Sequence, residues 1–266
     1  HNVVITGVGG TGVVTIGAVL AMAAHIDGKG AGMMEMAGLA QKGGAVHIHC
    51  RIAEKPSDIS AIRVETGECD ALIGGDLVVS AGAKTIGLMK TGRTIGVVNS
   101  HEIITGDFTR DTEFKLPAER LKMSLEARIW DKLVMFDASD LAKALLGDSI
   151  YSNMMAFGAV WQMGAIPVTY EAILGAIELN GAAINQNIKA FELGRWAYLH
   201  PKDANALLTS NVVTLPKTLE EKIAFRADHL GVYQSKRLSK RYRKFVDQVA
   251  DEELREALAL GYHKLL

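Results

Sequence analysis

The stretch Val3-Val4-Ile5-Thr6-Gly7-Val8-Gly9-Gly10-Thr11-Gly12 leads directly into an apolar segment at residues 13–24. Branched apolar residues that end in a glycine cluster, before a helix of small residues, predict a strand, a tight turn and a helix N-terminus. We expect Gly7 to permit the turn and Gly12 to let the helix approach the strand. Gly9 and Gly10 would leave the backbone open to another group. This pattern is typical of an α/β sheet.

Length, charge and hydropathy set the broad class of the protein. The 266 residues suffice for one domain with an appendage or for two domains. The formal net charge of −1 gives no overall field that would favour nucleic acid or an acidic membrane. No apolar run approaches the about 20 residues that a membrane span needs. We therefore expect a protein that binds neither nucleic acid nor membrane.

Two local features qualify this picture. Cys50 and Cys69 lack metal-ligand spacing, so we interpret them as reduced core thiols and expect a cytoplasmic protein. The first core strand begins at residue 2 without a lead-in, whereas natural termini usually carry a few loose residues. We interpret the chain as a piece of a longer polypeptide.

Dinucleotide binding is one interpretation of the glycine-rich turn. It needs an acidic residue near the end of the second strand, predicted at residues 33–36, and Asp27 or Glu35 could bind a ribose there. The Asp-Gly turn explains Asp27 without a ligand. A free-standing NAD-dependent dehydrogenase would also need a catalytic Tyr/Lys or His/Asp pair, and no spacing marks one.

A second informative stretch alternates over residues 46–52. It puts apolar residues on one face and His47, His49 and Arg51 on the other. One interpretation is the solvated face of an edge strand. The other is a surface that faces an anion or a subunit, beside Gln41-Lys42-Gly43-Gly44. The two histidines could also bind a metal, but the sequence offers no third ligand nearby.

The middle of the chain alternates strands and helices, which predicts a three-layer α/β/α sheet, mixed or parallel and Rossmann-like. Asp76 is the expected N-cap of a helix at 77–90, and Gly147 the expected end of a helix at 141–146. We also expect one strand that ends within residues 71–76 and two more at 94–99 and 133–137. A loop or hairpin is expected at 106–116 and a helix at 117–128.

The composition changes at residues 152–196, and the pattern there predicts three helices, at 153–163, 169–180 and 183–198. Asn153, Asn185 and Asn187 stand in apolar surroundings there. They either satisfy buried backbone groups or contact a neighbouring subunit.

The last part of the chain is charge-rich. We expect a first domain at 1–205, a linker at 206–216 and a helical extension to residue 266, the start of a further domain. Six basic residues at 236–244 accompany an apolar stripe of Leu238, Tyr242, Phe245 and Val249. This pattern predicts a helix packed on one side and solvated on the other.

Three blocks of the chain resemble, in order, the gamma domain of 2-oxoacid:ferredoxin oxidoreductases, above all the fused indolepyruvate type. They are Gly7-Val8-Gly9-Gly10-Thr11-Gly12; Gln41-Lys42-Gly43-Gly44-Ala45-Val46 with Arg51-Ile52; and Asn153 with Gly158, Ala165-Ile166-Pro167 and residues 187–195. The resemblance covers about the first 200 residues.

This resemblance implies a part of a thiamine diphosphate enzyme. Such enzymes decarboxylate 2-oxoacids with the help of magnesium, pass electrons through iron-sulfur clusters to ferredoxin, and commonly give the acyl group to coenzyme A. The chain has no Gly-Asp-Gly and Asn-Asn segments for the diphosphate, and two cysteines cannot hold a cluster that needs four. The resemblance therefore implies a domain that is inactive alone and that assembles with other domains or subunits into an oligomer. In that assembly the domain would shape access for substrate or coenzyme A.

The chain departs from the family pattern at two positions. Lys42 replaces the usual Arg and loses its bidentate geometry, and Ala37 replaces a small polar residue. We name no catalytic residue and no metal ligand. The expected contacts with a ligand or partner are Gly7, Gly9, Gly10, Thr11, Gly12, Gln41, Lys42, Gly43, Gly44, His49 and Arg51. A non-catalytic assembly module is a further alternative.

Overall fold

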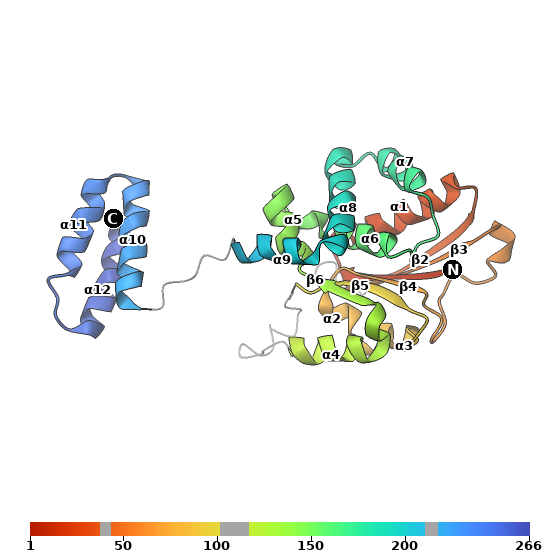
Figure 1. The fold of residues 1–266 in the computed structure, drawn as a ribbon, viewed down its shortest axis with the longest axis horizontal. Helices are drawn as coiled ribbons and strands as arrows, with labels where there is room; N and C mark the ends of the chain where they lie inside the picture. The colour runs from red at the N-terminus through yellow and green to blue at the C-terminus, as the bar shows by residue number, and fades with distance from the viewer. Residues whose placement is uncertain (38–43, 102–116, 211–217) are drawn as a thin grey trace. The chain divides into compact units, whose positions relative to one another are not determined.

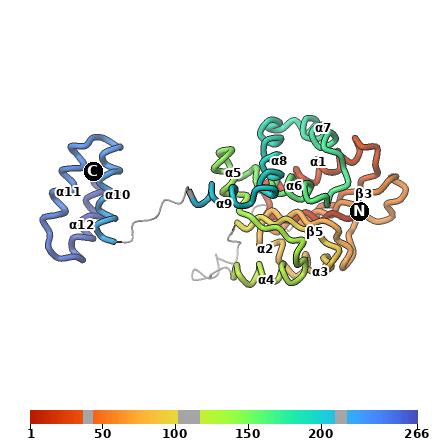
Figure 2. Tube along the Cα trace, in the orientation of Figure 1, coloured from red at the N-terminus to blue at the C-terminus, as the bar shows by residue number. Residues whose placement is uncertain are grey.

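The computed structural model describes residues 1–37, 44–101, 117–210 and 218–266. The chain forms two compact units, His1–Asn211 and Val212–Leu266, whose path is traced in Figure 2. No helix in the described ranges is long and apolar enough to cross a membrane.

A six-stranded mixed sheet in the order β2-β3-β1-β4-β5-β6 forms the centre of the first unit. β3 is antiparallel to both of its neighbours, whereas β1, β4, β5 and β6 are parallel. The predicted α/β class is confirmed, and the sheet is mixed. The strands are β1 (Asn2–Val8), β2 (Gly30–Ala37), β3 (Ala45–Ala53), β4 (Ala71–Gly74), β5 (Ile95–Asn99) and β6 (Leu133–Phe136).

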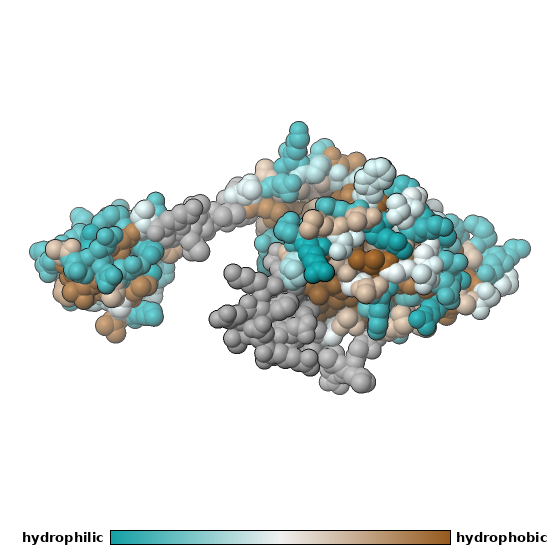
Figure 3. Space-filling view, turned by 90° about the horizontal axis from the view of Figure 1, so that it is seen from below, coloured by the Kyte–Doolittle hydropathy of each residue, from teal (hydrophilic) through white to brown (hydrophobic). Residues whose placement is uncertain are grey.

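Helices cover both faces of this sheet (Figure 1). Alternation along β1 directs Val3 and Ile5 into one apolar core and Val4 into the other. The helices of the first layer are α1 (Val13–Ile26), α5 (Ala138–Leu146), α6 (Ser152–Gln162), α7 (Tyr170–Asn180), α8 (Ile184–Leu199) and α9 (Pro201–Ser210), and those of the second are α2 (Leu77–Ser80), α3 (Ala83–Leu88) and α4 (Ala118–Ile129). Hydrophilic and hydrophobic residues intermix on the face seen in Figure 3.

Local signals placed most helix ends correctly. The Asp76 carboxylate accepts from the Val79 amide as the N-cap of α2, and Gly147 ends α5 in the left-handed region. The expected single helix at 77–90 is wrong, because the backbone at Gly82 is extended and separates α2 from α3. The expected linker is wrong where α9 continues to Ser210, because Ala204 and Leu207 pack into the core of the first unit. Residues 106–116 lie outside the described ranges.

Two glycines let α6 and α8 cross with their backbones almost in contact. A Cβ on Gly158 would lie 2.0 Å from the carbonyl oxygen of Phe191, and one on Gly194 would lie 1.9 Å from that of Met155. No L side chain fits either position, since the obstacle is backbone. This crossing determines where α6 lies over the sheet.

The second unit consists of three helices, α10 (Leu219–Tyr233), α11 (Lys236–Val246) and α12 (Glu252–Leu265). Tyr242 and Val246 of α11 are buried among them. The predicted one-sided packing of α11 is confirmed, but Phe245 is 44% exposed and Val246 takes the buried position.

The α6–α8 crossing predicts a large cost for a single methyl group. Gly194→Ala should lower the free energy of unfolding by at least ~2 kcal/mol, because the helices must move apart. Gly175→Ala in α7 is the control, since its Cβ would meet only Ile26 Cδ1 at 3.4 Å. Urea unfolding followed by tryptophan fluorescence measures both. Equal stability of the two variants would contradict the close crossing.

Candidate functional site

The carboxyl ends of the parallel strands form a crevice at one edge of the sheet. From β1 the chain enters the first helical layer, and from β4 it enters the second, so the ends of β1 and β4 are a topological switch point. Ligands of open α/β sheets bind outside such points. A hollow of about 320 Å³ lies there and is lined by residues that include Gly10, Thr11, Gly75, His101, Ser139 and Ser149.

The glycine loop after β1 reaches this crevice through Gly10 and Thr11. Gly10 and Gly12 have φ angles of 91° and 85°, which L residues adopt only with strain. The close approach of strand and helix occurs at Gly7, whose Cβ would lie 2.3 Å from Val13 Cγ2, and not at Gly12 as we expected. The Gly9 amide donates to the Gly44 carbonyl at 2.8 Å, so it serves the loop itself.

Asn153 on α6 holds the glycine loop in place. Its side-chain Nδ2 donates to the Thr11 carbonyl, and only 3% of the residue is exposed. Its Oδ1 has no hydrogen-bond partner among the described residues and would lie 2.5 Å from a Cβ on Gly75. The interpretation that Asn153 satisfies buried backbone is confirmed, and Gly75 is the residue that leaves it room.

Sequence reasoning missed Asn99, which organises the far wall of the crevice. Its Nδ2 donates to the Gly75 carbonyl at 3.1 Å and to Ser139 Oγ at 2.8 Å, and its Oδ1 accepts from the Ala138 amide at 3.0 Å. A buried asparagine that ends an otherwise apolar strand was the available signal. Asn99 therefore connects the ends of β4 and β5 to the start of α5.

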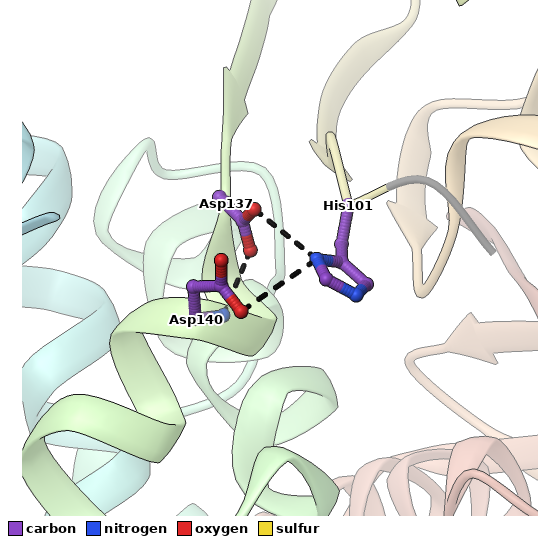
Figure 4. A group of neighbouring side chains, drawn as sticks. All are labelled: His101, Asp137 and Asp140. Atoms are coloured by element: carbon purple, nitrogen blue, oxygen red, sulfur yellow. Dashed lines mark hydrogen bonds and ion pairs between the residues drawn. The ribbon is translucent and has the colours of Figure 1, made fainter. Parts of the chain in front are cut away.

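His101, Asp137 and Asp140 form a compact polar group beside the crevice (Figure 4). One ligand atom from each lies within 4.8 Å of the others, which could suit a cation. His101 Nδ1 already lies 3.2 Å from Asp137 Oδ2, and Asp140 Oδ1 pairs with Lys143 at 3.2 Å. We therefore assign the group to a hydrogen bond between the end of β5 and the start of α5, with an ion pair within α5.

His49 lies inside the sheet and not on an edge strand, so the solvated-edge interpretation is wrong. β3 pairs with β1 on one side and β2 on the other, and His49 is 1% exposed. Its Nδ1 accepts from the Val64 amide at 2.8 Å, which places the proton of the neutral ring on Nε2. Burial first, and then the charges of His47, Arg63 and Arg51, lower its pKa to about 4.

The other residues predicted to contact a ligand or partner bond to groups within the chain or lie outside the described ranges. Arg51 lies on the same face of β3 but pairs with Glu68 at 3.0 Å, and His47 Nε2 bonds the Thr85 hydroxyl at 3.1 Å. Gly44 accepts from Gly9. Gln41, Lys42 and Gly43 lie outside the described residues.

The fold removes both candidate ribose ligands. Asp27 accepts from the Thr169 amide and hydroxyl, each at 2.6 Å, and so joins α1 to α7. Glu35 is on β2, and β3 lies between β2 and β1, about 10 Å away at the usual strand spacing. Neither carboxylate lies beside the glycine loop.

The cofactors that the resemblance implies do not fit the side chains present. Cys50 and Cys69 are both buried, and burial raises the pKa of each thiol to about 12. Two such thiols do not suit an iron-sulfur cluster, which takes thiolates, usually four of them. The sequence also lacks the diphosphate-binding segments. We assign no step through these groups to this chain.

The Asn153 contact predicts a local effect on the glycine loop. Asn153→Ala should cost about 1–3 kcal/mol of stability and increase amide exchange at residues 9–12, because the Thr11 carbonyl loses its buried donor. Asn187→Ala is the control, since its bond to the Ala182 carbonyl is exposed. Hydrogen exchange by mass spectrometry measures both. Unchanged exchange in Asn153→Ala would argue against a holding role.

His49 predicts a pH dependence of stability. Because its folded pKa is lowered to about 4 from the ordinary 6.5, the unfolded chain binds this proton first as the pH falls. Stability should therefore fall between pH 6.5 and 4, by about 2 kcal/mol at pH 5 from His49 alone. His49→Asn keeps an acceptor for Val64 and should lose less stability between pH 7 and pH 5 in urea titrations. Parallel losses in both proteins would show that His49 titrates normally.

Comparison with known proteins gives a consistent result. The family model described as Pyruvate ferredoxin/flavodoxin oxidoreductase matches residues 2–197. The chain is similar to the indolepyruvate oxidoreductase subunit IorB of Pyrococcus horikoshii, at 29% identity over 73% of this chain and 94% of that protein. The IorB of Thermococcus kodakarensis is 28% identical with the same coverage.

A solved structure shares both fold and sequence with the chain. The gamma subunit of a keto/oxoacid ferredoxin oxidoreductase from Geobacter sulfurreducens has a TM-score of 0.52 and 27% identity, covering 75% of this chain and 98% of that one. The family match spans all six strands of the sheet and the helices through most of α8. The chain therefore belongs to the pyruvate ferredoxin/flavodoxin oxidoreductase family and is a gamma-type domain of a 2-oxoacid:ferredoxin oxidoreductase.

Proposed function

We propose that this chain is the gamma domain of an indolepyruvate or other aryl pyruvate:ferredoxin oxidoreductase. The observation that carries the proposal is the similarity to IorB subunits over 94% of their length. Enzymes of this family use thiamine diphosphate, iron-sulfur clusters and coenzyme A. Because the chain has no residues suited to hold the first two groups, other domains or subunits supply them, and the chain alone is inactive.

Within that enzyme the crevice at the glycine loop faces a ligand or a catalytic domain. Gly10 and Thr11 on one side, and Ser139 and Ser149 on the other, give it backbone amides and hydroxyls beside the apolar side chain of Ile150. Groups of this kind suit the polar parts of coenzyme A or of a 2-oxoacid. The domain thus packs on the catalytic domains and shapes access for substrate or coenzyme A. The three-helix unit is the start of a further domain.

Substrate choice and dependence on partners can be measured with the complete enzyme, purified anaerobically. We expect ferredoxin reduction with a higher kcat/KM for indolepyruvate than for pyruvate, 2-oxoglutarate or branched-chain 2-oxoacids, and no reduction by this chain alone. A preference for pyruvate would overturn the aryl assignment. NAD-dependent oxidation by the isolated chain would support the dehydrogenase alternative.

The crevice can be tested by obstruction. Ser149→Phe in the complete enzyme should raise KM for coenzyme A or the 2-oxoacid by about tenfold, because the ring enters the hollow. Ser57→Phe, on the exposed turn Pro56–Asp58, is the matched control. Wild-type kinetics for Ser149→Phe would rule out a role of the crevice in access and would favour the assembly module.

A further inference from the structure

A second hollow lies between helix α3 and the face of β3 that carries His47 and His49. Its volume is about 570 Å³, and its wall includes Arg63, Thr66 and Lys84. It shares no described lining residue with the crevice at the glycine loop. A cavity of this size is typical of small-molecule sites.

The wall of this hollow contains a buried donor without an acceptor. His49 Nε2 carries the ring proton, because Nδ1 accepts from the Val64 amide. Nε2 is buried and has no hydrogen-bond partner among the residues that the structure describes. An unsatisfied buried N–H costs about 1–3 kcal/mol. An acceptor brought by a ligand would remove this cost.

The charges around the hollow select the kind of acceptor. Arg63 and Lys84 are exposed residues in the wall, and the Thr66 hydroxyl adds a further donor. Among the described lining residues none is acidic. The charge of Arg63 contributes to the lowered pKa of His49, and that of Lys84 to the lowered pKa of His47. Two fixed positive charges and a neutral N–H match a doubly charged oxyanion such as a phosphate monoester.

The hollow is larger than a phosphate group and has an apolar side. Met36 and Leu88 line it, and an adjoining hollow of about 340 Å³ shares His47 and Lys84 and continues to Val78 and Val79. An organic group attached to the phosphate would cover this apolar wall.

We propose that this pocket binds a phosphorylated organic small molecule, whose phosphate accepts from His49 Nε2 and pairs with Arg63 and Lys84. Coenzyme A and a separate phosphorylated metabolite both supply this oxyanion, and the titrations below distinguish the two sources. The proposal does not rest on the function proposed above, because it concerns direct binding by this chain.

Isothermal titration of the full chain tests the pocket with four probes: inorganic pyrophosphate, adenosine 3′,5′-bisphosphate, coenzyme A and citrate. We expect pyrophosphate and the bisphosphate to bind, and citrate to bind at least tenfold more weakly. Tighter binding of coenzyme A than of the bisphosphate identifies coenzyme A as the source of the phosphate. Equal or weaker binding identifies a separate phosphorylated molecule.

Two variants of His49 distinguish the loss of the Nε2 donor from a loss of folded structure. His49→Asn keeps an acceptor for the Val64 amide but lacks a donor at the Nε2 position, so it should weaken pyrophosphate binding about tenfold or more. His49→Gln retains a donor there and should bind more tightly than His49→Asn. Arg63→Gln and Lys84→Gln should each weaken binding by a similar factor, while Lys189→Gln, on α8, should not.

Three results would overturn the proposal. They are no binding of any phosphate probe at millimolar concentration, binding that His49→Asn, Arg63→Gln and Lys84→Gln leave unchanged, and citrate binding as tight as that of pyrophosphate. Circular dichroism of each variant shows whether it is folded. If His49→Asn does not fold, Arg63→Gln and Lys84→Gln still decide the outcome, since both residues are exposed.

Discussion

The hydrogen bond from the Asn153 side chain to the Thr11 carbonyl is the contact on which the crevice depends. It joins α6 to the glycine loop, although Asn153 and Thr11 are 142 positions apart in the chain. Gly75 has to lack a side chain for Asn153 to lie there. The glycine at the end of β4 therefore serves the loop at the end of β1.

The position of Asn153 in turn depends on how α6 is packed. Gly158 and Gly194 allow the backbones of α6 and α8 to approach until their surfaces meet without side chains between them. Such a contact leaves little freedom for α6 to shift, because interiors are close-packed. A packing constraint between two helices thus reaches a loop at the edge of the sheet. This explains why the small residues at 152–196 matter for the site.

The antiparallel strand β3 gives the sheet its particular chemistry. By pairing with β1 it takes the place next to the glycine loop that a second parallel strand holds in dinucleotide-binding folds. An acidic ribose ligand is thereby kept two strands away. β3 also brings His47 and His49 next to α3. Because β3 is paired on both sides, these histidines lie in the interior of the sheet and not at a solvated edge. The hollow at the glycine loop and the hollow beneath α3 share no lining residue in the part of the chain that the structure describes.

The sequence by itself determined the local elements and the family. Residues 3–12 predicted the strand, turn and helix, the alternation at 46–52 predicted the two faces of β3, and Asp76 and Gly147 marked helix ends, because each signal is contained within a few neighbouring residues. Tertiary structure alone decided the neighbours of β3, the break at Gly82, and the partners of Asn99, Asp27 and Asn153. A period of two tells which face a side chain takes but not which strand lies beside it. Side-chain amides and carboxylates find partners across the fold, at separations that no local pattern encodes.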